Sequence, residues 1–430
     1  MNSCDKTLLR HTRSVCPICL KPIPARLVQD QGTVLMEKNC SQHGTFSVPI
    51  WRNYIDLETW RGTIPETEKF PDCPQGCESG ICPEHQQGSC CVLLEVTRRC
   101  NLHCAYCFAD GALPEPALDE LKRAVSCIYE KGKAPLLQLS GGEPTLRDDL
   151  PELVAYAHSL GFPYIQLNTN GLRLAKDEAY VRALAEAGLS FVFMQFDGVT
   201  DDVFLTLRGA PLLEQKKWAI EHCDRCGLGV TLVPTVVRGV NDGQIGDLVR
   251  LGAELSPAVR GIHFQPVSYF GRIPEQPDDS QRYTLDELIN SLTVQAGIPA
   301  SCLESSHCDH PLCGLHATFI VMQDRSLRPL RAVSSGCCGQ TDARQNREYV
   351  GRHWKRETCS CCGESADIST LDGFLSRSKT FSFTITAMAF QDAMNLDIER
   401  LRRCSLHVYE KGVLMPFCAR YLTPISTEPE

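Results

Sequence analysis

The sequence has 430 residues, 43% of them hydrophobic, and a formal net charge of −9. This length and composition predict two or three domains with ample material for buried cores. The negative charge argues against a general nucleic-acid binder and against a protein that binds anionic membranes, because both need a basic surface.

Cysteine is the unusual component, with 25 residues beside 12 histidines. The first residues, from Met1 to Ser14, are polar and lack the apolar core of a signal peptide. No apolar run approaches the roughly 20 residues that a membrane span needs. We therefore expect a cytoplasmic protein without an integral membrane segment, in which the cysteines are metal ligands rather than disulfide partners.

Residues 1–90 are predicted to form a cysteine-rich metal-binding region. Cys16-Pro-Ile-Cys19 followed by Cys40-Ser-Gln-His43 is typical of zinc ribbons and rubredoxin-like sites. We expect Cys16, Cys19 and Cys40 to bind zinc or a mononuclear iron, with His43 either a fourth ligand or a bystander. Further along, closely spaced thiols suit an auxiliary iron–sulfur cluster, with a redox-active thiol pair as the alternative. The candidate ligands there are Cys73, Cys77, Cys82 and Cys90.

Residues 91–280 are predicted to form an α/β core. Apolar runs of strand length alternate with amphipathic stretches of helical period, which indicates βαβ units and a parallel sheet. Six such strands favour a partial (β/α)6 barrel, whose chemistry lies at the carboxyl ends of the strands. The expected strands are Val92–Val96, Leu136–Leu139, Tyr164–Asn168, Phe191–Phe196, Val230–Val237 and Ile262–Val267; the expected helices are Leu118–Lys131, Leu150–Leu160, Asp177–Ala187 and Leu212–Cys226.

Three cysteines follow the first of these strands at C-x3-C-x2-C spacing: Cys100, Cys104 and Cys107. Thiolates are soft ligands that suit iron–sulfur clusters. In a four-iron cluster, three cysteines leave one iron open to chelate a small molecule. A zinc knuckle is the alternative, but zinc normally takes four ligands and no fourth Cys or His follows at ribbon spacing.

A glycine-rich turn, Gly141-Gly142-Glu143-Pro144, follows the second strand. Paired glycines let a backbone approach a ligand closely, and Glu143 can accept a hydrogen bond from an ammonium group. Polar side chains at the ends of the next two strands are candidate contacts for the same ligand, with a simple polar turn as the alternative. They are Asn168, Asn170, Gln195 and Asp197.

The cluster motif and the glycine-rich turn together resemble the radical S-adenosylmethionine superfamily. In that family C-x3-C-x2-C has an aromatic residue before its last cysteine, here Tyr106, and G-G-E-P binds the methionine amino group of the cofactor. The resemblance implies that Cys100, Cys104 and Cys107 hold a [4Fe–4S] cluster. It also implies reductive cleavage of S-adenosylmethionine to a 5′-deoxyadenosyl radical, with an electron donor such as a ferredoxin or flavodoxin.

Residues 281–430 are again cysteine-rich and are predicted to form an auxiliary-cluster region. The candidate ligands are Cys302, Cys308, Cys313, Cys404 and Cys418. The layout of the whole chain is similar to that of the tetraether lipid synthase-like and molybdopterin-cofactor cyclase-like radical enzymes. The matching pieces are the Cys16/Cys19 ribbon, Cys82-Pro-Glu-His, Glu95-Val-Thr, His310-Pro-Leu-Cys313 and Pro416-Phe-Cys418; the interval from Cys77 to Cys82 is wider than in that group.

The leading hypothesis is a radical enzyme that functionalises an unactivated C–H bond, by C–C or C–S bond formation on a lipid-like or small substrate. Two alternatives stay open: a radical maturase that modifies a peptide or protein, and a non-catalytic iron–sulfur electron carrier. The G-G-E-P turn argues against the carrier, because a carrier needs no turn that binds an amino acid.

Overall fold

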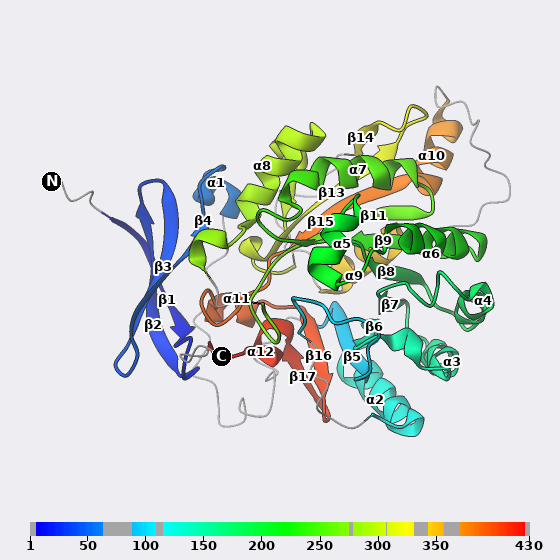
Figure 1. The fold of residues 1–430 in the computed structure, drawn as a ribbon, viewed down its shortest axis with the longest axis horizontal. Coiled ribbons are helices and arrows are strands. Elements are labelled where there is room, and N and C mark those ends of the chain that lie inside the picture. Colours follow the sequence, from blue (N-terminus) through cyan, green and yellow to red (C-terminus); the bar gives the residue numbers. More distant parts are fainter. Residues whose placement is uncertain are drawn as a thin grey trace.

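Two sheets make up the fold in the computed structural model, which describes residues 6–62, 88–108, 115–274, 278–306, 308–330, 343–356 and 370–425 (Figure 1). The smaller sheet is antiparallel and holds β1 (Thr7–Val15), β2 (Pro22–Asp30), β3 (Thr33–Cys40) and β4 (Gly44–Trp51), in that order. Alternate residues of β3, from Val34 to Cys40, are buried, as expected for a sheet with one covered face. Helix α1 (Leu57–Arg61) follows.

The larger sheet has a parallel centre that confirms the predicted α/β core. Its strands run in the order β12-β13-β15-β11-β9-β8-β7-β6-β5-β16-β17. The six expected strands are present as β5 (Cys91–Thr97), β6 (Leu136–Gly141), β7 (Ile165–Thr169), β8 (Phe191–Gln195), β9 (Gly229–Val233) with the short β10 (Thr235–Val236), and β11 (Val259–Pro266). Neighbours among β5, β6, β7, β8, β9 and β11 pair in parallel.

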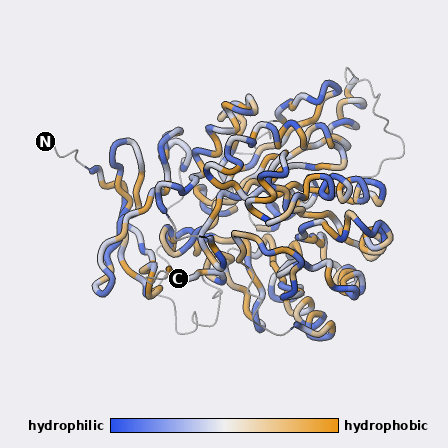
Figure 2. Tube along the Cα trace, in the orientation of Figure 1, coloured by the Kyte–Doolittle hydropathy of each residue, from blue (hydrophilic) through white to orange (hydrophobic). Residues whose placement is uncertain are grey.

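Helices connect these strands and bury apolar stripes against the sheet. In α2, for example, Leu121, Val125 and Ile128 are buried. The connecting elements are α2 (Leu118–Lys131), η3 (Pro144–Leu146), α3 (Leu150–Leu160), α4 (Glu178–Glu186), α5 (Asp201–Arg208), α6 (Leu213–Arg225), η4 (Asp242–Gln244) and α7 (Ile245–Glu254). Figure 2 shows apolar residues along the central strands and alternating hydropathy along the outer helices. Within the described ranges no helix has both the length and the apolar character to cross a membrane.

The C-terminal third of the chain extends the same sheet at both edges. Strand β15 pairs in parallel with β11, and β16 pairs in parallel with β5. The elements of this part are η5 (Asp279–Gln281), α8 (Leu285–Ala296), η6 (Ala300–Cys302), β12 (Glu304–Ser305), η7 (Pro311–Cys313), β13 (Gly314–Val321), β14 (Leu327–Leu330), α9 (Ala343–Trp354), α10 (Leu371–Thr380), β15 (Ser382–Met388), α11 (Ile398–Arg402), β16 (Leu406–Glu410), β17 (Val413–Pro416) and α12 (Phe417–Arg420). The three-part division of the chain remains a prediction.

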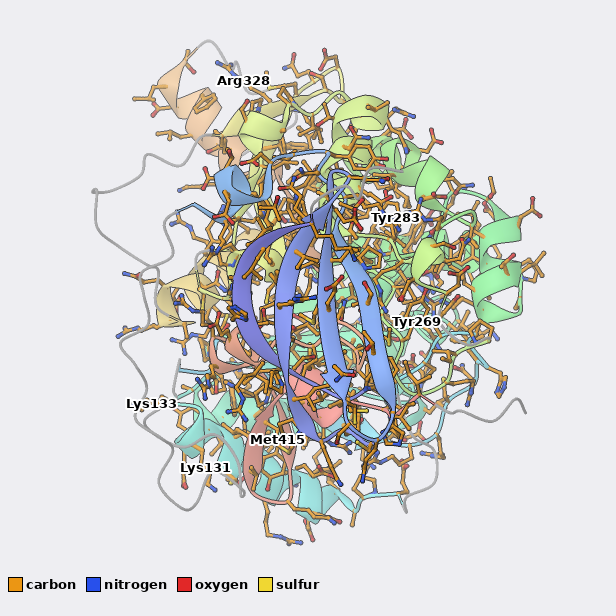
Figure 3. The ribbon with its side chains drawn as sticks, turned by 90° about the vertical axis from the view of Figure 1, so that its left-hand side faces the viewer. Lys131, Lys133, Tyr269, Tyr283, Arg328 and Met415 are labelled. Atoms are coloured by element: carbon orange, nitrogen blue, oxygen red, sulfur yellow. The ribbon has the colours of Figure 1, made fainter. Side chains whose placement is uncertain are left out.

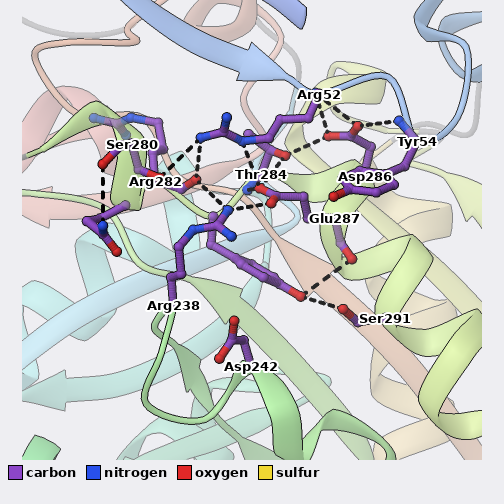
Figure 4. Close-up of polar contacts among 12 residues, drawn as sticks. Arg52, Tyr54, Arg238, Asp242, Ser280, Arg282, Thr284, Asp286, Glu287 and Ser291 are labelled. Atoms are coloured by element: carbon purple, nitrogen blue, oxygen red, sulfur yellow. Dashed lines mark hydrogen bonds and ion pairs between the residues drawn. The ribbon is translucent and has the colours of Figure 1, made fainter. Parts of the chain in front are cut away.

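The N-terminal sheet is attached to the rest of the protein by buried charged groups. Figure 3 looks onto this sheet from its outer side, and Figure 4 shows one of the contacts. The backbone amides of Arg52 and Tyr54 both donate to the same carboxylate oxygen, Oδ2 of Asp286 at the start of α8, at 3.0 Å each. Next to it, Glu287 accepts from Arg238 in the loop after β10.

A second contact joins the N-terminal sheet to the segment before α11. The hydroxyl of Thr12 donates to Asp397 at 2.8 Å, and the buried ammonium of Lys38 donates to the carbonyl of Ala393 at 2.7 Å. Because these buried polar groups are satisfied only when the two parts are together, the small sheet is a fixed part of the molecule.

Candidate functional site

The loop after β5 carries the three cysteines of the cluster motif and is held in place from two sides. The amide of Ala105 donates to the carbonyl of Leu207 at the end of α5 (3.1 Å). Cys107 and Arg272 exchange two backbone hydrogen bonds, at 3.1 and 2.8 Å. Cys100, Cys104 and Cys107 all line one cavity of about 390 Å³ that extends into the parallel sheet. The cluster loop is therefore an ordered rim of this cavity.

The glycine-rich turn lies directly against the cluster loop. A Cβ atom on Gly141 would lie 2.3 Å from the carbonyl oxygen of Thr97, and one on Gly142 would lie 2.1 Å from that of Arg99. The amides of Gly142 and Glu143 donate to the same two carbonyls, at 2.8 and 2.7 Å. Only glycine permits this approach, so the turn fixes the end of β6 to the loop that presents the thiols.

Glu143 is buried and joins the ends of β6 and β7. Its Oε1 accepts from the amide and hydroxyl of Thr145 and from the hydroxyl of Thr169, while its Oε2 accepts from the amide of Asn170 at 2.7 Å. Among the described residues Oε2 accepts from one donor only, so it keeps capacity for at least one more. Glu143 lines the cavity, and one ammonium group is what it can still accommodate.

Three of the four predicted strand-end residues line the cavity: Asn168, Asn170 and Gln195. Asn170 also donates to Asn101 in the cluster loop at 2.7 Å. These three place polar side chains around the cavity rim at the ends of β7 and β8. Pro144, the last residue of the glycine-rich turn, is the first residue of η3.

Asp197 is fully buried and does not line the cavity. Its carboxylate accepts two hydrogen bonds from the guanidinium of Arg208, at 2.7 and 2.6 Å, and one from the amide of Thr235. Burial opposes the charge of Arg208, but the paired carboxylate outweighs it and raises the pKa of Arg208. Arg208 does line the cavity beside Cys104, so Asp197 orients a cation there rather than contacting a ligand itself.

Lys216 is a site residue that the sequence analysis missed. It is completely buried on α6, and its ammonium donates to the carbonyl of Asn170 (2.6 Å) and to the carbonyl and side-chain oxygen of Gln195 (2.7 and 2.8 Å). Burial lowers the pKa of Lys216 to about 7. A signal was present in the sequence, because Lys216 occupies the same helical face as the buried Ala219 and Cys223.

The C-terminal segment packs against the end of the cluster loop. The ring of Phe108 lies 5.5 Å from that of Phe417 and 4.7 Å from that of Tyr421, and Phe108 and Phe417 both line the cavity. The hydroxyl of Tyr421 donates to Glu95 near the end of β5 at 2.8 Å, and burial raises the pKa of this phenol. The C-terminal segment therefore supplies part of the apolar wall of the cavity.

The ligand atoms of Cys16, Cys19, Cys40 and His43 lie within 4.8 Å of one another. A tetrahedral zinc ion with Zn–S bonds of about 2.3 Å holds its ligands about 3.8 Å apart, so these four residues fit a mononuclear metal. The Nδ1 of His43 lies 3.5 Å from the sulfurs of Cys16 and Cys40, which brings His43 into the set. A hydrogen bond from the Gln42 amide lowers the pKa of Cys40 to about 6.

The thiols of the cluster loop face a common cavity. Cys100, Cys104 and Cys107 all line it and follow one another on a single loop. Within the described part of the chain, the ribbon quartet is the only group of three or more ligand atoms compact enough to hold one metal ion. Three thiols on one loop that surround an open space fit a multinuclear iron–sulfur cluster.

Three more candidate ligands converge near the C-terminus. Cys313, Cys404 and Cys418 line a second, small cavity of about 20 Å³. Burial raises the pKa of all three thiols, that of Cys418 to about 12. Arg400 donates to the sulfur of Cys313 at 3.4 Å and supplies a positive charge beside the group. Burial favours the neutral thiols, whereas the charge of Arg400 favours the thiolate of Cys313 that a metal ligand must be.

The remaining predicted ligands divide between the main cavity, the core and residues outside the described ranges. Cys90 lines the main cavity; its sulfur lies 3.5 Å from that of Cys91, and it packs with the buried Cys308. Cys302 packs against the main core and lines neither cavity. Three further predicted ligands lie outside the described residues: Cys73, Cys77 and Cys82.

Comparisons with known proteins match two parts of the chain to families. Residues 94–252 match the radical SAM superfamily, and residues 8–52 match the HMPTM N-terminal zinc ribbon domain. These ranges contain the cluster loop with the glycine-rich turn and the ribbon quartet, respectively.

One similar protein covers almost the whole chain. The 7,8-dihydro-6-hydroxymethylpterin dimethyltransferase of Methanocaldococcus jannaschii is 33% identical over 472 aligned residues, which cover 95% of this chain and 92% of that protein. The Fe-coproporphyrin III synthase of Methanosarcina barkeri is 30% identical over 51% of this chain and 56% of its own. The crystal structure of Streptococcus suis SuiB has a TM-score of 0.41 and 17% identity, and the match covers 48% of this chain and 45% of that one.

Proposed function

Since this chain belongs to the radical S-adenosylmethionine superfamily, we propose that it forms a C–C bond on a carbon of a small, flat nitrogen heterocycle of the reduced-pterin class. The full-length similarity to a pterin dimethyltransferase supports the substrate class. A cavity of about 390 Å³, with polar side chains at the ends of β7 and β8, favours a small substrate over a lipid-like one.

One observation carries this proposal: the cluster thiols, the glycine-rich turn and the interior of the sheet share one cavity. Cys100, Cys104 and Cys107 would hold the [4Fe–4S] cluster, which supplies, when bound, the electron that cleaves S-adenosylmethionine. Glu143 would accept from the methionine ammonium through its free Oε2 position, and the asparagines at the end of β7 would flank it.

The C-terminal thiols Cys313, Cys404 and Cys418 would hold an auxiliary cluster. Their shared small cavity and the guanidinium of Arg400 support this assignment. Anaerobic reconstitution of wild type and of Cys418→Ala, followed by iron and sulfide analysis, tests it. We expect wild type to bind more iron than one four-iron cluster and one ribbon metal require, and Cys418→Ala to lose the excess.

The activity is tested after anaerobic reconstitution and reduction by assaying 5′-deoxyadenosine from S-adenosylmethionine, with Cys104→Ala alongside. We expect formation in wild type, none in the variant, and a higher rate when a reduced 6-hydroxymethylpterin is added. Stimulation by a peptide or a polar lipid instead of the pterin would refute the substrate class. No product from correctly loaded wild type under any of these conditions would refute the radical activity.

A further inference from the structure

Three aromatic rings close the main cavity at the end opposite the cluster loop. The last turn of α9 lies at the starts of β9 and β11: a Cβ on Gly229 would meet the carbonyl of Trp354 at 2.4 Å, and Arg260 donates to the carbonyl of His353 at 3.1 Å. The cluster loop instead follows the last residue of β5. Because the starts and ends of parallel strands lie at opposite edges of a sheet, Trp354 closes the far end of the cavity.

The three rings come from three different elements and contact one another. The ring of Phe193 on β8 lies 5.1 Å from that of His263 on β11 and 5.2 Å from that of Trp354 on α9. All three line the cavity, and we call this set the aromatic floor. The indole of Trp354 donates to the hydroxyl of Thr384 at 3.0 Å, which fixes its orientation. The ring planes are tilted against one another by 52°, 39° and 79°, so they form an apolar end wall that suits the faces and edges of a flat ring.

His263 adds a polar group to the aromatic floor. Its Nδ1 lies 2.8 Å from the hydroxyl of Thr386, and that hydroxyl donates to the carbonyl of Ile262 at 3.4 Å. The contact with Nδ1 is the shorter of the two, and in the neutral ring either nitrogen can carry the proton, so Nε2 offers the cavity one hydrogen-bonding group, a donor or an acceptor. Burial lowers the pKa of His263 to about 3, so the ring stays neutral.

The imidazole and two amide groups remain open to a ligand. Nε2 of His263 makes no hydrogen bond within the described residues, and in the same part of the chain neither do the side-chain amides of Gln138 and Gln265, which also line the cavity. All three residues are half-buried, so these groups face the cavity. A neutral imidazole and two amides beside aromatic rings match a heterocycle that carries ring N–H and C=O groups.

We propose that the aromatic floor binds the substrate ring, with Nε2 of His263 hydrogen-bonded to a polar group at the ring edge and with Phe193 and Trp354 packed against the ring. This inference rests on the proposed function and assigns its substrate-binding residues. S-adenosylmethionine is placed by the thiols and the glycine-rich turn at the other end of the cavity, so the floor serves the second molecule.

Binding of a reduced 6-hydroxymethylpterin to the anaerobically reconstituted protein, measured by calorimetry, tests the assignment. His263→Phe keeps a ring of similar size but removes the hydrogen-bonding nitrogens, and we expect the Kd to rise about ten-fold or more. His263→Gln returns both a donor and an acceptor near the Nε2 position and should recover most of the affinity. Binding should also quench tryptophan emission, and Trp354→Phe should remove most of that quench.

His353→Phe is the matched control. His353 is another buried, neutral histidine on α9, bound through Nδ1 to the carbonyl of Tyr349, but it does not line the cavity. We expect it to bind the pterin like wild type. Unchanged affinity in a folded His263→Phe would overturn the assignment, as would a parallel loss of S-adenosylmethionine affinity. No pterin binding by wild type would instead refute the proposed substrate class, and the assignment with it.

Discussion

Replacing Gly142 with alanine should displace the cluster loop from the end of β6. The new Cβ would lie 2.1 Å from the carbonyl oxygen of Arg99 and 2.7 Å from its carbon, and both are backbone atoms that no side-chain rotation can move away. The carbonyl would have to retreat by about 1.3 Å to reach an ordinary contact distance. Overpacking of this kind costs about 1–3 kcal/mol. Losing the hydrogen bond from the Glu143 amide to Arg99 adds about 1 kcal/mol.

The free energy of unfolding should therefore fall by about 2–4 kcal/mol in a denaturant titration of Gly142→Ala. Arg99 immediately precedes Cys100, and a functional site has to be held within about 0.5 Å, so iron and sulfide content and 5′-deoxyadenosine formation should fall as well. Gly243→Ala is the control, because a Cβ there meets nothing within 4 Å. The reasoning is refuted if both variants retain wild-type stability and a full cluster.

Three further changes test other parts of the site. Asp197→Asn leaves the buried Arg208 cation without its partner and should lower the free energy of unfolding by about 3–5 kcal/mol, whereas adding Arg208→Met should recover part of that loss. Burial lowers the pKa of Lys216 from 10.5 to about 7, so between pH 7 and 10.5 the unfolded chain binds more protons than the folded protein and the free energy of unfolding rises with pH. Lys216→Met should flatten that rise in denaturation measured as a function of pH. An unchanged slope would contradict the lowered pKa of Lys216. Cys16→Ser should lose one metal ion per chain by elemental analysis yet keep the cluster absorbance; loss of both would argue against separate sites.

The parallel core could be predicted from local patterns because its elements are long and regular. Helices α2 and α3 begin and end at the predicted residues, since each carries an apolar stripe of helical period over three or more turns. Helix α5 escaped prediction because it spans only Asp201–Arg208. The cluster motif and the glycine-rich turn were found because their residues lie within one loop and one turn.

Residues that act through long-range contacts could not be assigned in this way. From the sequence, Asp197 has the position of a ligand-binding residue at a strand end; only the structure shows its ion pair with Arg208. Lys216 lies in a mostly polar helix, in which a lysine is normally expected at the surface. Spacing left His43 undecided, whereas the hairpin of β3 and β4 sets it beside Cys16. The convergence of Cys313 with Cys404 depends on strands far apart in sequence, which no local pattern encodes.

The strands that cover both edges of the parallel core, β15 and β16, are synthesised late, so the core cannot be covered until translation is nearly finished. β5 and β11 are made early, but β15 begins only at Ser382 and β16 at Leu406. Until those residues emerge, two unpaired strand edges face solvent, and such edges pair readily with other chains. The nascent chain should therefore depend on chaperones until its last strands are synthesised, and a chain shortened before Ser382 should aggregate rather than survive as a smaller enzyme.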